Sequence, residues 1–356
     1  EHVVPGDRVI IAQAGNLPGG TLLADSIYSE ILEILQSGGV SSDDVQRIIA
    51  RPTIESDTTS FPDEVPDTEI QNISTTLFNR LNDSDTAYLS ADETGEPLHL
   101  ARALVDADVV LSIGSFGYDA SLRGRSPEGE LWPSFARQNH CQKFIKALLK
   151  KRQLALHHWR DESEQITAQL GILASLRLVC GNHQTLAGAA FGFPAASITQ
   201  SRLQAKEWRP TIPTRSPLAI AGIPDRPCRF VELTRAIAAA ARVTTHDGTI
   251  CIACNMSEEP GIIFPRWRHG VDLPMLLREA SDSEETALLL DALHTSLFAK
   301  ALGDRRLVLL SQLDQNFVED LDIGHAETPD ANNRLIQQSE SACVLHEANR
   351  LCPTKS

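Results

Sequence analysis

Short apolar runs alternate with amphipathic stretches along the first part of the chain. Residues 8–12 and 45–50 are mostly apolar segments of strand length, and residues 21–37 between them carry apolar side chains at helical spacing. Gly38 and Gly39 follow the helical stretch, as glycine commonly does after the last turn of a helix. A strand, a helix and a second strand form a βαβ unit, the building block of a parallel sheet. The pattern therefore predicts an α/β domain at the start of the chain.

The stretch from Gly95 to Trp132 continues this pattern and contains a charged loop. Pro97 can occupy the first turn of a helix, and the apolar residues after it recur at helical spacing, which predicts a helix over residues 97–105. Residues 109–113 form a short apolar run, typical of a strand buried on both faces. Because open α/β sheets bind ligands at the carboxyl ends of their strands, we expect a site in the loop that follows. The charged residues of that loop are Asp119, Arg123, Arg125, Glu128 and Glu130.

The rest of the pattern completes the first domain and predicts a second. Up to residue 208 we expect helices over 68–81, 140–169 and 199–208, and strands over 87–89, 172–180 and 186–192. Further on we expect strands over 218–221, 249–254, 307–310 and 342–345, and helices over 228–241 and 284–302. We therefore predict an N-terminal domain over residues 1–208, a linker over 209–215 and a C-terminal domain over 216–356. The fold class is α/β, with mostly parallel sheets flanking an interdomain cleft.

Composition narrows the class of partner. The chain has 356 residues, 42% of them hydrophobic, and a net charge of −15. This acidity argues against nucleic acid and anionic membrane surfaces, because both require a basic face. No apolar run approaches the roughly 18 residues of a membrane span, and the first residues do not resemble a signal peptide. The seven scattered cysteines are typical of reduced thiols, so we expect a cytoplasmic protein.

The order of these segments resembles the nickel-pincer lactate racemase family. The resemblance begins at Val3 with the segment Val-Val-Pro-Gly-Asp, continues through Gly95 to Gly114, and reaches Pro353. In the second half it rests on Gly248, Ile250, Cys254, Glu258, Gly261, Trp267, His346 and Pro353. It implies two α/β domains with a cleft between them. It also implies inversion of a 2-hydroxy acid by hydride transfer to a nickel-bearing pincer, which the family holds on a lysine and a histidine.

Several positions depart from the family's pattern. Asp119 stands where the family has its nickel-binding histidine, and Gly129 or Glu130 where it has the cofactor-bearing lysine. Lys143 is the first lysine in the chain, so the lysine is absent from the expected loop. Positions matching the family's anion site hold Ala14, Leu17 and Pro18, and no histidine occurs within residues 51–55. We therefore predict neither the pincer cofactor nor a metal.

The remaining candidates for chemistry are few. His140 is a candidate base together with Asp119, because histidine exchanges protons near neutral pH. Arg123 and Arg125 can clamp a carboxylate or pair with the acidic residues of their own loop. Glu258 is a candidate ligand-binding residue at the end of a strand. Cys251 and Cys254 have metal-site spacing, but residues three apart on a strand face opposite sides, which favours core packing.

These observations leave three functional hypotheses. The first is a diverged member of the family that has lost the racemase site and binds a small carboxylate or 2-hydroxy acid in the cleft. The second is an active 2-hydroxy-acid racemase or epimerase with a relocated or non-covalent cofactor, using Asp119, His140 and the arginines. The third is a structural protein whose cleft is closed.

Overall fold

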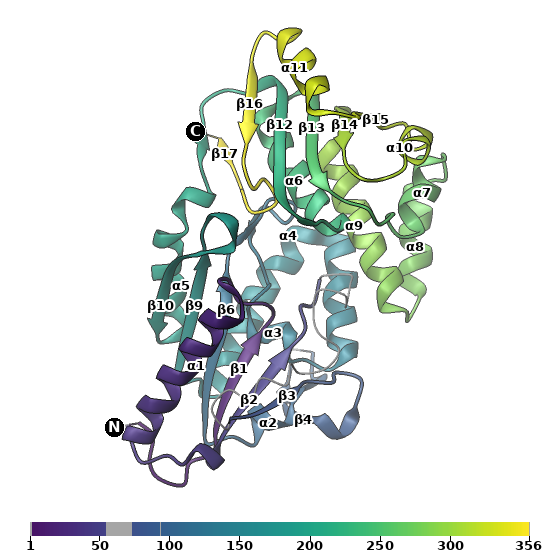
Figure 1. The fold of residues 1–356 in the computed structure, drawn as a ribbon. Helices are drawn as coiled ribbons and strands as arrows, with labels where there is room; N and C mark the ends of the chain where they lie inside the picture. The colour runs from purple at the N-terminus through teal and green to yellow at the C-terminus, as the bar shows by residue number, and fades with distance from the viewer. Residues whose placement is uncertain (1, 55–72, 93, 356) are drawn as a thin grey trace. The chain divides into compact units, whose positions relative to one another are not determined.

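The computed structural model describes residues 2–54, 73–92 and 94–355, which form two compact units (Figure 1). Unit 1 comprises Glu1–Gly117, Ser126–Ala147 and Lys151–Ala205. Unit 2 comprises Tyr118–Arg125, Leu148–Lys150 and Lys206–Ser356. The α/β class with mostly parallel sheets is confirmed in both units. Within the described residues, no helix has both the length and the apolar character that crossing a bilayer requires.

Unit 1 is built on a six-stranded sheet with the order β10-β9-β6-β1-β2-β3. All neighbouring pairs are parallel except β9 and β10. The strands are β1 (Val9–Ala14), β2 (Val45–Ala50), β3 (Ser74–Leu77), β6 (Val109–Phe116), β9 (Ala174–Cys180) and β10 (Leu186–Gly192). Since β2 and β6 flank β1 on opposite sides, the strand order reverses between β1 and β6, a common place for ligands in such sheets.

Two long helices of unit 1 lie where the apolar periodicity predicted them. The helix α1 (Gly20–Ser37) packs Tyr28 and Leu32 against Val9 and Ile11 of β1, and all four side chains are buried. This burial removes apolar surface from water, which is the main force that holds a helix on a sheet. The other long helix is α4 (Gln138–Gln169). The shorter helices are α2 (Arg102–Val105), α3 (Leu131–Ser134) and α5 (Pro194–Gln204).

Two predicted helices of unit 1 are wrong. Residues Pro97–Ala101 form the strand β5, antiparallel to β4 (Thr86–Ala91), and only Arg102–Val105 is helical. Leu98 and Leu100 are both buried, so burial in this segment has the period of a strand, and proline is tolerated at the first strand position. Of the helix predicted over 68–81, residues 68–72 lie outside the described part. Ser74–Leu77 is the strand β3, in keeping with its two β-branched threonines.

A third helix is shifted along the chain. The helix expected over residues 199–208 starts earlier, as α5, and ends at Gln204, with a 3₁₀ turn η4 (Lys206–Trp208) after it. Pro194 begins α5 because the first turn of a helix tolerates the missing proline N–H.

Unit 2 is built on a parallel five-stranded sheet with the order β15-β14-β13-β12-β16. The strands are β12 (Ser216–Pro227), β13 (Thr244–Asn255), β14 (Arg306–Leu310), β15 (Gly324–His325) and β16 (Ala342–Leu345). The helices are α6 (Phe230–Val243), α7 (Ile263–Arg268), α8 (Leu273–Asp282), α9 (Thr286–Leu302), α10 (Gln315–Asp320) and α11 (Pro329–Gln337). In Figure 1, α6 lies beside α9 and against β12 and β13.

An aromatic cluster forms much of the core of unit 2. Phe264 lies 4.8 Å, between ring centroids, from both Phe230 and Phe298. Alanines of α6 allow this helix to approach the sheet closely, and most of them are fully buried. A short hairpin, β7 (Tyr118–Asp119) and β8 (Gly124–Arg125), belongs to the same unit, and its Ala120 is part of this core.

Candidate functional site

Asp119 is a buried anchor of the β7–β8 hairpin. Its side chain is 2% exposed. One carboxylate oxygen accepts hydrogen bonds from the Ser121 N–H at 2.8 Å, the Ser121 hydroxyl at 2.5 Å and the Leu122 N–H at 3.2 Å. The other oxygen lies 2.9 Å from Nε of Arg235 on α6. One oxygen of Asp119 therefore holds the turn of the hairpin, and the other holds the hairpin on α6.

The two arginines of this hairpin lie in different environments. Arg123 is exposed, and its backbone has a φ of 64° in the turn of the hairpin. Arg125 is 7% exposed and engaged within the protein. Of the two predicted clamp residues, Arg123 is thus the one that presents its side chain to solvent. Glu258, in the loop after β13, is also exposed.

Glu130 pairs with an arginine that the sequence did not suggest. Its carboxylate lies 2.6 Å from the guanidinium of Arg177 on β9, and both side chains are at most 5% exposed. The same guanidinium donates a hydrogen bond to the Gly129 carbonyl at 2.6 Å. The loop that ends at Glu130 is therefore attached to the sheet of unit 1 by a buried ion pair.

Two glycines let this loop approach the backbone of β6. A side-chain Cβ placed on Gly129 would lie 2.1 Å from the Ser115 carbonyl oxygen, and Gly129 has a φ of +80°. A Cβ on Gly114 would lie 2.0 Å from the Gly129 carbonyl oxygen. In both cases the atom that the Cβ would meet belongs to the backbone, so a change of side-chain rotamer cannot make room for it. Only glycine fits at either position.

His140 lies in a buried cluster of rings in unit 1. Its ring is 4% exposed, and ring centroids of Trp132 and His99 lie 5.7 and 6.4 Å away. The Nε2 atom of His140 accepts a hydrogen bond from the His99 backbone N–H at 3.3 Å. Burial, with a contribution from the positive charge of Lys143, lowers the pKa of His140 to about 4. The imidazole is therefore neutral at pH 7, and its acceptor nitrogen already has a donor.

We expect this histidine to make stability depend on pH. The pKa of His140 is about 4 in the folded chain and 6.5 as its ordinary value, so the unfolded chain binds more protons between these values. Stability is unaffected above pH 6.5 and declines as the pH falls toward 4. Between pH 7 and pH 5 the loss from this group is about 2 kcal/mol.

Urea unfolding at pH 7 and pH 5 measures this difference. In His140→Gln, whose amide oxygen can still accept the N–H bond, the pH dependence should shrink by that amount. His158→Gln, at an exposed position with no ion pair among the described residues, is the matched control and should retain the wild-type difference. Equal pH dependence in wild type and His140→Gln would contradict the burial of a neutral imidazole.

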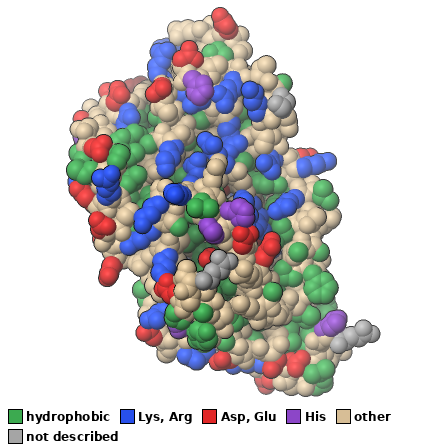
Figure 2. All heavy atoms as spheres, turned by 180° about the vertical axis from the view of Figure 1, so that it is seen from behind, with side chains coloured by type: hydrophobic (Ala, Val, Ile, Leu, Met, Phe, Trp, Pro, Cys, Tyr) green, Lys and Arg blue, Asp and Glu red, His purple; other side chains and the backbone are tan. Residues whose placement is uncertain are grey.

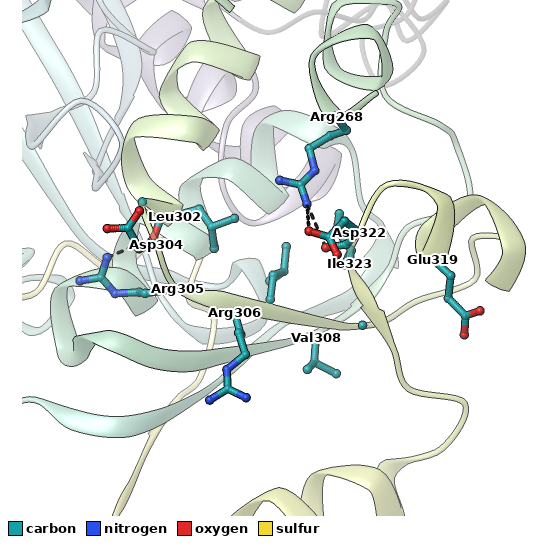
Figure 3. Close-up of a pocket in the computed structure, with 12 residues that line it drawn as sticks. Arg268, Leu302, Asp304, Arg305, Arg306, Val308, Glu319, Asp322 and Ile323 are labelled. Atoms are coloured by element: carbon teal, nitrogen blue, oxygen red, sulfur yellow. Dashed lines mark hydrogen bonds and ion pairs between the residues drawn. The ribbon is translucent and has the colours of Figure 1, made fainter. Parts of the chain in front are cut away.

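One pocket of unit 2 lies at the amino end of β14. Its volume is about 590 Å³, and Arg268, Arg305 and Arg306 line it (Figure 3). Figure 3 shows Arg268 reaching toward Asp322, with Arg306 and Glu319 pointing away from this pair. Arg268 donates to the Leu321 and Asp322 carbonyls, and Arg305 to those of Leu302 and Thr244. Two of the three guanidiniums therefore donate hydrogen bonds to backbone carbonyls of the protein.

A second pocket lies at the carboxyl edge of the same sheet, where open α/β sheets usually bind ligands. Its volume is about 400 Å³. It is lined by Ile223, Ala253, Cys254, Asn255, Leu310, Ser311, Gln312 and Pro329. The sequence placed one candidate, Glu258, in the loop after β13, but Glu258 does not line this pocket. The ends of β12, β13 and β14 at one sheet edge were a usable signal for the pocket itself.

Comparison with known proteins identifies the fold. No protein-family model and no curated protein matches the chain. The lactate racemase apoprotein from Thermoanaerobacterium thermosaccharolyticum is similar with a TM-score of 0.69 and 15% identity, over 98% of this chain and 87% of that one. This chain has a lactate racemase-like fold. A structural-genomics protein from Thermotoga maritima is similar with a TM-score of 0.66 and 12% identity, over 99% and 94%.

The lactate racemase-like fold raises the question of whether the nickel pincer fits this chain. At the positions that the resemblance matches to the cofactor-bearing lysine, Gly129 has no room for a side chain and Glu130 is bound to Arg177. At the position that it matches to the nickel-binding histidine, the oxygens of Asp119 are held by Arg235 and the hairpin. Among the described residues, no three His, Cys, Asp or Glu side chains form a group that could hold a metal. At the matched positions the chain therefore offers neither a lysine nor an unengaged metal ligand.

Proposed function

We propose that this protein uses the lactate racemase-like fold without nickel-pincer chemistry and binds a small carboxylate, such as a 2-hydroxy acid. The observation that carries the proposal is the close backbone approach at Gly129, one of the two positions that match the cofactor-bearing lysine. A lysine there would place its Cβ against the Ser115 carbonyl and would adopt a left-handed backbone. The chain's own packing therefore disfavours the covalent link.

The state of Asp119 and His140 supports the same proposal. A metal at Asp119 would have to displace Arg235 and leave that guanidinium without its carboxylate. A base at His140 would have to release the His99 N–H, and its pKa of about 4 makes it a poor proton acceptor at neutral pH. These states of Asp119 and His140 disfavour a role for either residue in the proton transfers of a racemase.

Two observations support a carboxylate as the ligand class: the similar structure of a lactate racemase and the exposed side chain of Arg123. The related structure is a lactate racemase, and lactate is a 2-hydroxy acid. Arg123 presents a guanidinium that can bind a carboxylate through two parallel hydrogen bonds. Figure 2 shows many Lys and Arg side chains on one face of this acidic chain, so net charge does not bar a small anion.

The decisive experiment is coexpression with the pincer biosynthesis enzymes, followed by intact mass, nickel content and a lactate racemisation assay. We expect the unmodified mass, no bound nickel and no racemisation. A mass adduct with one nickel per chain and racemase activity would overturn the proposal in favour of a relocated cofactor.

Ligand binding is tested on the same protein. Lactate and other 2-hydroxy acids should raise the melting temperature, because a ligand that binds only the folded state stabilises it by about 2.7 kcal/mol at 100 times its Kd. Arg123→Gln should abolish this shift. Arg278→Gln, on the exposed face of α8, is the matched control and should retain it. An equal shift in both variants would exclude Arg123 as the carboxylate ligand.

A further inference from the structure

Two cysteines that are distant in sequence meet at the carboxyl edge of the sheet of unit 2. Cys228 directly follows β12, and Cys254 lies near the end of β13. The Cys228 N–H donates to the Asn255 carbonyl at 3.2 Å, which holds the two backbones side by side. Each thiol is the largest influence on the pKa of the other, so the two side chains are neighbours, and the Cys228 thiol also donates to the Arg229 carbonyl at 3.5 Å. Adjacent backbones and neighbouring thiols are the arrangement from which a disulfide can form without large movement.

The two thiols differ in access. Cys254 is half-buried and lines the pocket of about 400 Å³ described above. Cys228 is 4% exposed and lies at the start of α6. A small molecule in the pocket therefore meets Cys254, whereas Cys228 is buried and does not line the pocket.

The two thiols also differ in acidity. The interaction with the Cys228 thiol lowers the pKa of Cys254 and outweighs burial, which raises it, and the backbone N–H of Met256 lowers it further. The pKa of Cys228 is raised, first by its interaction with Cys254 and then by burial. Glu232 opposes a thiolate at both positions, and Arg226, which pairs with Glu232 at 2.5 Å, favours one at Cys228. Cys254 is thus the thiol that ionises first.

We propose that Cys254 and Cys228 form a redox-active dithiol that exchanges with a low-molecular-weight disulfide in this pocket. The Cys254 thiolate attacks one sulfur of the disulfide, forms a mixed disulfide and releases one thiolate. Cys228 loses its proton and attacks Cys254 Sγ, which breaks the mixed disulfide and releases the second thiolate. The protein dithiol loses two electrons, the small disulfide gains them, and the two protein protons end on the two released thiols.

Other cysteines of the chain do not share this arrangement. Cys251, three residues before Cys254, is fully buried, and burial alone raises its pKa to about 11. Cys343 on β16 is half-buried like Cys254, but burial raises its pKa and no neighbouring thiol lowers it. Cys343 is therefore an internal reference for a thiol of similar access without a partner.

The test treats the folded wild-type protein with bis(2-hydroxyethyl) disulfide and maps the cysteine peptides by mass spectrometry. We expect a loss of two hydrogens and a linked pair of peptides that contain Cys228 and Cys254, reversed by dithiothreitol. Iodoacetamide at pH 7 should modify Cys254 at least about tenfold faster than Cys343, since the thiolate is the nucleophile.

Two variants separate the steps. Cys228→Ser should stop at the mixed disulfide on Cys254, and Cys254→Ser should give neither product. Cys343→Ser is the matched control and should behave as wild type. The proposal is overturned if the wild-type protein forms no Cys228–Cys254 link, or if Cys254 and Cys343 react at equal rates. Both outcomes are read on wild type, so they do not depend on the folding of a variant.

Discussion

Replacing Gly129 with alanine is expected to lower the free energy of unfolding by about 2–5 kcal/mol. The added Cβ meets the Ser115 carbonyl oxygen of β6, and overpacking against a rigid backbone typically costs 1–3 kcal/mol. The left-handed backbone, with φ of +80°, adds about 1–2 kcal/mol for any residue with a Cβ. Urea unfolding, monitored by circular dichroism, measures the sum.

Gly95→Ala is the matched control for this experiment. Gly95 has nearly the same backbone, with φ of +84°, but no atom lies within 4 Å of the position of its Cβ. We expect it to cost only the backbone term of about 1–2 kcal/mol. If both variants lose the same stability, the loop does not approach β6 as closely as described, and the steric argument against a lysine at Gly129 fails.

The sequence predicted the parts of the fold that depend on local pattern. Strands buried on both faces, such as Val109–Phe116, are continuous apolar runs, and α1 carries a regular apolar stripe that ends at paired glycines. These signals lie within a few residues of one another. The parallel sheets followed from the alternation of strands and helices.

The failures occurred where pairing with another strand decides which residues are buried. In Pro97–Ala101, apolar residues fit both a helical and a strand period, and pairing with the preceding strand β4 selects the strand. Ser74–Leu77 is a strand because it extends the sheet at β2. Neither β4 nor β2 can be recognised as the partner from the short segment itself, because tertiary contacts override weak local preference.

The candidate site shows the same division between local and distant information. The charged loop was placed correctly after a buried strand, but the partners of its residues were not predicted. Asp119 is held by Arg235, which is 116 residues away, and Glu130 by Arg177, 47 residues away. The sequence did not predict the Cys228–Cys254 contact, because the Cys251–Cys254 spacing lies within a single strand. Cys228 and Cys254 lie at the ends of two adjacent strands, β12 and β13.

Replacing Arg177 with methionine should be as damaging as the change at Gly129. It leaves the buried Glu130 carboxylate without its guanidinium and also removes the donor to the Gly129 carbonyl. Removing one partner of a buried ion pair typically costs about 3–5 kcal/mol. Arg266→Met is the matched control, because its pair with Glu279 is about half exposed, and surface pairs contribute at most about 1 kcal/mol.

A second change distinguishes loss of the ion pair from loss of packing. In the double variant Arg177→Met with Glu130→Leu no charge remains unpaired at this place, and replacement of a buried pair by apolar side chains is often neutral. We expect the double variant to recover most of the stability lost by Arg177→Met alone in urea unfolding. No recovery would mean that the Arg177 bond to Gly129, rather than its charge, holds the loop on the sheet, and the loop would then be fixed mainly by its backbone contact with β6.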